Sequence, residues 1–143
     1  MKKALNKLTA PKSVMPEKII QFGEGNFLRA FVDWIVWNMD AKTNFNGSVV
    51  VVQPIERGMV EWLNGQDCLY HVNLQGRLKG EAVNTLERID VISRALNPYS
   101  QNAAFMALAE QPEIRFVISN TTEAGITFDP ACKFTDAPAA SYP

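Results

Sequence analysis

The sequence predicts an α/β fold of the Rossmann-like, doubly wound type, with a mainly parallel sheet and an antiparallel strand insertion. Three observations indicate this class. Residues 18–22 and 48–53 are short apolar runs typical of buried strands. A strongly periodic helical segment lies between them, and two glycines, Gly23 and Gly25, separate the first strand from that helix. A strand, a tight turn and a helix N-terminus in this order can receive a pyrophosphate group.

Length and charge narrow the class of protein. The 143 residues are enough for one domain with a hydrophobic core. The sequence has 14 Lys and Arg residues and 15 Asp and Glu residues, so there is no surplus of positive charge that would favour nucleic acid as a partner. The longest apolar runs are too short to span a membrane, so no membrane partner is expected. We expect a polar, partly ordered lead-in over residues 1–15 and one domain over residues 16–143.

Cysteine and histidine usage argues against a metal site. Cys68 and Cys132 are isolated in the sequence, and His71 is the only histidine. A protein zinc site needs more ligands at shorter spacing, so no metal is expected. Isolated cysteines fit a reduced, cytoplasmic environment. For His71 the expected role is structural, with no part in catalysis.

The first strand and the helix after it form the clearest pattern in the chain. Residues 18–22 contain β-branched and aromatic side chains and lie between Pro16 and Gly23. The helix carries a continuous apolar stripe with charged residues off it; the stripe consists of Leu28, Phe31, Val32, Ile35, Val36 and Met39. We expect Trp34 and Trp37 to widen this apolar surface and pack against neighbouring elements.

A second strand is predicted over residues 48–53. Its run of four valines is continuous rather than alternating, which is typical of a parallel strand that is covered on both faces. Pro54 ends the run. Strand, helix and strand together make a βαβ unit.

The pattern changes after Gly58. Residues 59–63 indicate a short helix, which Asn64 and Gly65 close. Residues 69–74 and 84–92 both have extended patterns, and we interpret them as antiparallel strands inserted into the α/β core.

The α/β pattern then resumes. Asn97 and Pro98 form a typical helix start, and Pro112 stops that helix. Residues 113–119 are expected to form another buried strand. The polar residues 120–125 follow at its carboxyl end, where open α/β sheets bind their ligands. Nothing after residue 126 resembles a closing element, so we expect the domain to be incomplete at its C-terminus.

The glycine turn is the first candidate site. Gly23 permits a sharp bend and Gly25 a close approach of backbone to phosphate, and the N–H groups of residues 26–28 would face the anion. Leu28 stands where the usual fingerprint has a third glycine, which serves close helix–sheet packing, and this suggests a shifted helix. A plain strand–helix turn is the alternative.

The second candidate site is the end of the second strand. Dinucleotide sites usually carry an Asp or Glu here that accepts hydrogen bonds from the adenosine ribose, but this chain has Gln53, followed by Pro54 and Ile55. Gln53 can still bond a ribose hydroxyl, and Glu56 could supply the carboxylate. Arg57 could instead face a 2′-phosphate and favour NADP. The alternative is that Glu56 and Arg57 are both solvated surface charges with no part in binding.

The third candidate site is the loop that contains Asn120, Thr121, Thr122 and Glu123. In a doubly wound fold it would lie beside the nicotinamide ribose. The alternative is a helix cap, with a threonine capping toward Glu123.

Several segments resemble the long-chain, zinc-independent polyol and sugar-acid dehydrogenases. Residues 23–30 look like that family's GxGxFxRA turn, with Leu28 where mannitol dehydrogenases have His. Residues 65–70 (GQDCLY) resemble its GQDYLY-like segment, and residues 112–126 are similar to its PEIRIVSLTITEGGY stretch. Residues 51–58, 119–128 and 136–143 look most like the family's reductases of keto sugar acids. The resemblance covers nearly everything from residue 16 onward.

This resemblance implies an NAD-dependent reductase that takes hydride from NADH and reduces a keto sugar acid, tagaturonate, to altronate; NADP is the less favoured cofactor. Fructuronate reductase and mannitol 2-dehydrogenase are the near alternatives, and a non-catalytic nucleotide-binding module is the alternative of another class. The family's catalytic Lys, Asn and His match no position here, so no catalytic residue is assigned. The implied cofactor-binding residues are Gly23, Gly25, Asn26, Phe27, Leu28, Gln53, Pro54, Ile55, Asn120, Thr121, Thr122 and Glu123.

Overall fold

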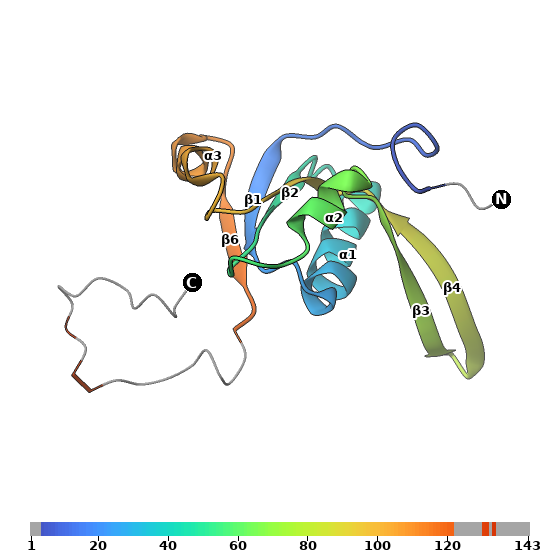
Figure 1. The fold of residues 1–143 in the computed structure, drawn as a ribbon. Coiled ribbons are helices and arrows are strands. Elements are labelled where there is room, and N and C mark those ends of the chain that lie inside the picture. The colour runs from blue at the N-terminus through green and yellow to red at the C-terminus, as the bar shows by residue number, and fades with distance from the viewer. Residues whose placement is uncertain (1–3, 122–129, 132, 134–143) are drawn as a thin grey trace.

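The computed structural model describes residues 4–121, 130, 131 and 133. Four parallel strands form one sheet in the order β5-β2-β1-β6, and two antiparallel strands form a separate hairpin. Figure 1 shows α1 on one face of the sheet, α3 on the other, and the hairpin extending away from the body. The elements are β1 (Glu17–Phe22), α1 (Asn26–Lys42), β2 (Ser48–Val52), α2 (Val60–Gly65), β3 (Tyr70–Leu78), β4 (Glu81–Ile89), β5 (Ile92–Leu96), α3 (Asn102–Met106), the 3₁₀ helix η1 (Ala107–Glu110) and β6 (Phe116–Ser119).

The predicted βαβ unit is confirmed. β1 pairs in parallel with β2, and all five residues of β2 are buried, as the valine run predicts. Alternate residues of β2 face opposite layers: Val49 and Val51 join the core beneath α1, whereas Val50 and Val52 join the core beneath α3 and η1. Burying one such valine contributes about 1.5–3 kcal/mol, so this strand anchors both layers.

The predicted buried face of α1 is wrong in part. Phe31 and Ile35 lie on the predicted stripe but are exposed, whereas Arg29 and Asp33 are buried. Residues 28, 29, 33 and 36 form the buried face, so the helix is rotated relative to the prediction. Apolar side chains occur on both faces of this helix, and hydrophobic periodicity alone therefore does not select the buried one.

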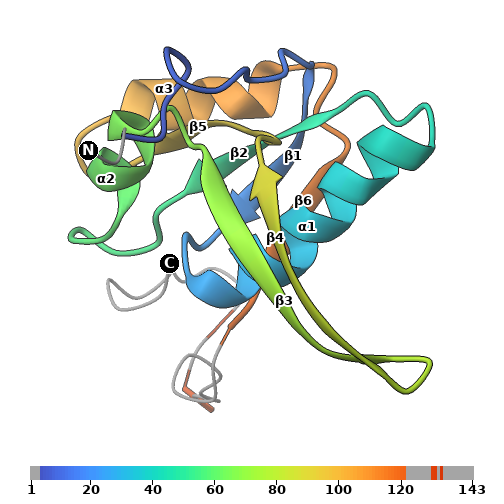
Figure 2. The same cartoon turned by 90° about the vertical axis from the view of Figure 1, so that its right-hand side faces the viewer.

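The antiparallel insertion is confirmed as the β3–β4 hairpin. Figure 2 shows it passing in front of α1. Trp34 of α1 donates a hydrogen bond from Nε1 to Glu87 of β4 at 2.5 Å, and Trp34 and Trp37 both pack on the core, as predicted. The expected extended segment 84–92 contains two elements, because β4 ends at Ile89 and Ile92 begins β5. β5 is a parallel strand that the sequence pattern did not separate from the hairpin.

The helix predicted to begin at Asn97 begins later, at Asn102. Asn97 makes a turn instead: its Oδ1 accepts a hydrogen bond from the Tyr99 N–H at 3.0 Å, and its carbonyl accepts one from Gln101 at 2.7 Å. The strand predicted after this helix is β6, but within the described residues it lies at the sheet edge. Phe116 and Val117 are exposed there, so burial of this strand was predicted wrongly.

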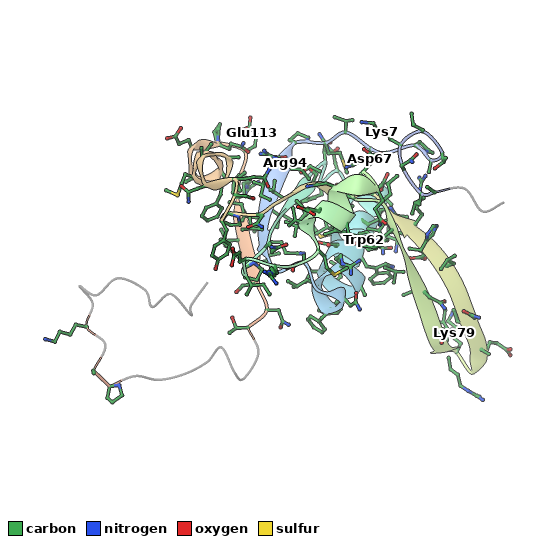
Figure 3. The ribbon with its side chains drawn as sticks, in the orientation of Figure 1. Lys7, Trp62, Asp67, Lys79, Arg94 and Glu113 are labelled. Atoms are coloured by element: carbon green, nitrogen blue, oxygen red, sulfur yellow. The ribbon has the colours of Figure 1, made fainter. Side chains whose placement is uncertain are left out.

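The lead-in makes defined contacts over its described part, where only partial order was expected. Lys12 donates hydrogen bonds from Nζ to the carbonyls of Asp67 and Ser93, at 2.7 and 2.8 Å. Ser13 donates to Asp90 through both its N–H and its hydroxyl. Lys7 and Asp67 form an ion pair, and Figure 3 shows the two residues together. These contacts hold the lead-in against the segments on either side of the hairpin.

Candidate functional site

The three predicted segments converge on one edge of the sheet. Phe22, the last residue of β1, is in register with Val52 of β2 on one side and Ser119 of β6 on the other. The glycine turn, Gln53 and Asn120 directly follow these three residues. β2 and β5 lie on one side of β1 and β6 on the other, so the direction of chain winding reverses between β1 and β6. Open α/β sheets bind ligands at such a switch point.

Gly23 makes the sharp bend predicted for it. Its φ is +116°, in a region that side-chain-bearing residues rarely adopt, and its N–H donates to the Val52 carbonyl at 2.9 Å. A Cβ built on Gly23 would lie 3.1 Å from the Cδ1 atom of Leu28. Leu28 is buried and occupies the position of the missing third glycine. Its side chain therefore packs against the turn at the start of α1.

Gly25 is the N-cap residue of α1 and lies open. No atom comes within 4 Å of a Cβ built on it, and no side chain of the described residues caps the helix. The backbone N–H groups at the start of α1 are therefore open to an anion, and the helix dipole adds to its attraction. Asn26 and Phe27 are exposed beside this opening.

The side chain of Gln53 has a different role from the one expected. It is buried and donates from Nε2 to the carbonyls of Ile55 and Glu56, at 2.7 and 3.0 Å, while its Oε1 accepts a bond from the Val60 N–H at 3.2 Å. Both amide hydrogens are thus used within the protein. Neither amide hydrogen of Gln53 is therefore left for the expected bond to a ribose. Gln53 instead shapes the loop that carries Pro54 and Ile55.

A cavity of about 590 Å³ lies beside this loop. Glu56 and Arg57, the two charges considered for the ribose side, are exposed and both line it. Asn97, Ser100 and Gln101 line it from the turn after β5. These three polar residues were missed because this segment was predicted to be a helix start. Their position after residues 92–96, where Ile92, Ala95 and Leu96 are apolar, was the available signal, since it matches the position of Gln53 after β2.

The third predicted segment is described only in part. Asn120 and Thr121 are exposed just beyond β6, next to the glycine turn. Thr122 and Glu123 lie outside the described residues. Asn120 therefore lies at the same sheet edge as the glycine turn.

Two buried titratable groups lie near the site. Burial raises the pKa of Asp33 to about 7, and a hydrogen bond from Tyr70 opposes this shift only in part. Burial also raises the pKa of the Cys68 thiol to about 11, which keeps it protonated and unreactive. His71, expected to be a satisfied structural residue, is exposed on β3.

Other classes of site were searched over the part of the chain that the structure describes. No group of three or more His, Cys, Asp or Glu side chains there could hold a metal ion. Over the same residues, the helices are too short or too polar to cross a membrane.

Comparison with known proteins agrees with this geometry. Over 141 residues, the chain is 78% identical to an altronate oxidoreductase of Phocaeicola vulgatus and 77% identical to one of Bacteroides thetaiotaomicron. It is 50% identical over 142 residues to one of Escherichia coli. Each alignment covers 99% of this chain and 29% of the relative, so the chain spans less than a third of the length of these relatives.

Two solved structures with the same fold are dehydrogenases. Pseudomonas fluorescens mannitol 2-dehydrogenase, in a ternary complex with NAD and D-mannitol, matches with a TM-score of 0.68 and 25% identity over 85% of this chain and 27% of that protein. A substrate-free D-sorbitol dehydrogenase matches with a TM-score of 0.64 over 80% of this chain. The family described as the mannitol dehydrogenase Rossmann domain matches residues 17–141. This chain therefore belongs to the mannitol dehydrogenase Rossmann domain family.

Proposed function

We propose that this chain is the NAD-binding domain of a CH–OH oxidoreductase that reduces a keto sugar acid, tagaturonate, to altronate with NADH. The observation that carries the proposal is the open N-terminus of α1 behind Gly25, at the switch point between β1 and β6. Relatives that are 50–78% identical and named altronate oxidoreductase support the substrate class. A cytoplasmic location is part of the proposal.

Each predicted segment has a part in cofactor binding. Gly23 and Gly25 bring the backbone of the turn close to the pyrophosphate, and the N–H groups at the start of α1 donate to it. The loop shaped by Gln53 borders the adenosine, and Asn120 borders the nicotinamide side. The bound cofactor supplies the hydride; the residues of this chain hold and orient it. The groups that hold the sugar acid and donate the proton belong to other parts of the full natural chain.

NAD is the favoured form of the cofactor. The mannitol 2-dehydrogenase with the same fold is in a ternary complex with NAD. Glu56 and Arg57 both line the cavity beside the β2 loop, where a carboxylate would accept bonds from a free ribose and a guanidinium would bind a 2′-phosphate. Comparing NADH with NADPH therefore tests which of the two charges dominates.

The test is a titration of the full natural chain with NADH and NADPH, followed by fluorescence and thermal stability. We expect NADH to bind and Gly25→Ala to weaken binding at least about tenfold, because a methyl group would stand between backbone and phosphate. Gly65→Ala is the matched control: its Cβ also meets no atom, but Gly65 ends α2, away from the turn. No response to either cofactor at millimolar concentration would refute the cofactor assignment.

Turnover tests the substrate. The full natural chain should oxidise NADH with tagaturonate as acceptor, and fructuronate and fructose should be poorer acceptors. NADH binding without turnover of any of the three would favour a non-catalytic nucleotide-binding module.

A further inference from the structure

Arg29 is a buried guanidinium that forms no ion pair with any described residue. It lies on the inner face of α1 and is only 6% exposed. The ion pairs among the described residues are Lys7 with Asp67 and Glu17 with Arg94, so Arg29 is in neither. Its partners are neutral: Nε donates to the carbonyl of Glu24 at 2.9 Å, and Nη2 donates to Oδ1 of Asn26 at 2.6 Å. The rings of Tyr70 and Trp62, the latter labelled in Figure 3, lie within 6 Å of the guanidinium carbon.

These bonds turn two successive carbonyls of the glycine turn inward. Gln21 of β1 donates from Nε2 to the carbonyl of Gly23 at 3.1 Å, and Arg29 holds the next carbonyl, that of Glu24. A carbonyl oxygen that faced a phosphate would repel it. With both oxygens held from within, the open side of the turn is left to N–H groups and to Asn26.

The hydrogen bonds around Tyr70 and Asp33 have more acceptors than hydrogens to fill them. Tyr70 has a single hydroxyl hydrogen but two acceptors near it, the carbonyl of Arg29 at 2.9 Å and Oδ2 of Asp33 at 3.2 Å. Oε1 of Gln21 and Oδ1 of Asp33 are buried and have no donor among the described residues. A proton on Asp33 would resolve this conflict, because Asp33 could then donate while Tyr70 donates to Arg29.

Among the groups that face Asp33, Arg29 is the one that carries a charge. They are Gln21 from β1, Arg29 from α1, Tyr70 from β3 and Cys68 from the segment before β3. Burial raises the pKa of both the Tyr70 hydroxyl and the Cys68 thiol, so both are neutral near pH 7. With a proton on Asp33 as well, the positive charge of Arg29 is not offset by any of these neighbours.

We propose that Arg29 is a positioning residue for the cofactor's pyrophosphate and that it acts while Asp33 is uncharged. The guanidinium holds the turn in the shape that presents its N–H groups, and its charge, which is in no ion pair among the described residues, adds to that of the α1 N-terminus. Ionisation of Asp33 cancels this charge in a site of low dielectric. Cofactor affinity therefore falls as pH rises. This inference rests on the proposed function.

The test measures the NADH dissociation constant of the full natural chain at pH 6, 7 and 8. Because the pKa of Asp33 is about 7, about nine-tenths of Asp33 is protonated at pH 6 and about one-tenth at pH 8. If only the protonated form binds well, the constant should rise roughly tenfold over this range. Asp33→Asn should bind at pH 8 as the parent binds at pH 6, with a flat pH profile. Arg29→Met should bind roughly tenfold more weakly or worse.

Two further variants separate positioning from folding. Arg29→Lys keeps the charge but loses the two-pronged contact, so its affinity should lie between those of the parent and Arg29→Met. Arg94→Met is the matched control, because Arg94 pairs with Glu17 at the start of β1 and lies away from the turn (Figure 3). It should lower stability and leave NADH affinity unchanged.

The outcomes distinguish this inference from the proposed function. Parent-like NADH affinity in both Arg29 variants, or the parent's pH profile retained in Asp33→Asn, would overturn the inference while the cofactor assignment stands. A parent chain that binds no NADH at any pH would refute the proposed function itself.

Discussion

Asp33→Asn should remove a large pH dependence from the stability of this protein. The Asp33 side chain is fully buried, and its pKa is raised from an ordinary 3.8 to about 7. The folded state therefore holds the proton more tightly than the unfolded state. Stability from this group is complete below pH 3.8, is lost as pH rises toward 7, and is lowest above pH 7.

The size of the effect follows from the shift. Each pKa unit is worth about 1.4 kcal/mol, so a shift of about three units costs about 4 kcal/mol at high pH. Most of this cost develops above pH 5, and the free energy of unfolding should fall by about 2.5 kcal/mol between pH 5 and pH 8 on account of Asp33 alone. Asparagine keeps the shape and the acceptor for Tyr70 but carries no charge, so the variant should lack this fall.

Urea unfolding of the cofactor-free chain at pH 5, 6, 7 and 8 measures the difference. The free energies of the parent and Asp33→Asn should diverge as pH rises. Asp67→Asn is the control, because a hydrogen bond from the Lys7 N–H lowers the pKa of Asp67 and this carboxyl stays ionised from pH 5 to 8. Parallel curves for the parent and Asp33→Asn would refute the raised pKa of Asp33 and, with it, the uncharged state on which the role of Arg29 depends.

Three further predictions concern the turn, its neighbouring loop and the buried thiol. Gly23→Ala should destabilise the protein by about 1–3 kcal/mol in urea unfolding, because alanine is strained at a φ of +116° and its Cβ crowds Leu28; an unchanged midpoint would contradict the bend. Gln53→Ala should lower the free energy of unfolding by about 2–4 kcal/mol, because the buried Val60 N–H loses its acceptor and two loop carbonyls lose their donor. A loss as small as that of the same change at an exposed glutamine such as Gln75 would argue against this role in the loop. Cys68 is buried and its pKa is raised to about 11, so it should resist alkylation at pH 8 until the chain unfolds. Peptide mapping after timed iodoacetamide treatment measures this labelling. Fast labelling of Cys68 in the folded protein would contradict the prediction.

The sequence predicted much of the fold because the signals were local. The valine run of β2 identified a doubly covered strand, and the glycines at 23 and 25 identified the turn between β1 and α1. The hairpin followed from two successive extended patterns. These features depend on the conformational limits of nearby residues, and such limits are readable without knowing the neighbours.

Other features were decided by packing between distant segments. β5 merged with β4 in the sequence, because only two residues separate the end of the hairpin from the next parallel strand. Asn97 has the pattern of a helix cap, but its side chain closes a turn and its Nδ2 donates to the carbonyl of Glu56, 41 residues away in sequence. Local propensity gives no information on such a partner.

The candidate site divides in the same way. By itself, the sequence determined that residues 23–28, 53–55 and 120–121 lie at the carboxyl ends of strands, because strand ends are locally encoded. Only the tertiary structure decided that Gln53 bonds its own loop and that Arg29 and Asp33 are buried while Phe31 and Ile35 are exposed. Burial of two such polar side chains depends on partners such as Tyr70, 41 residues from Arg29 in sequence, and hydrophobic periodicity favours the opposite face.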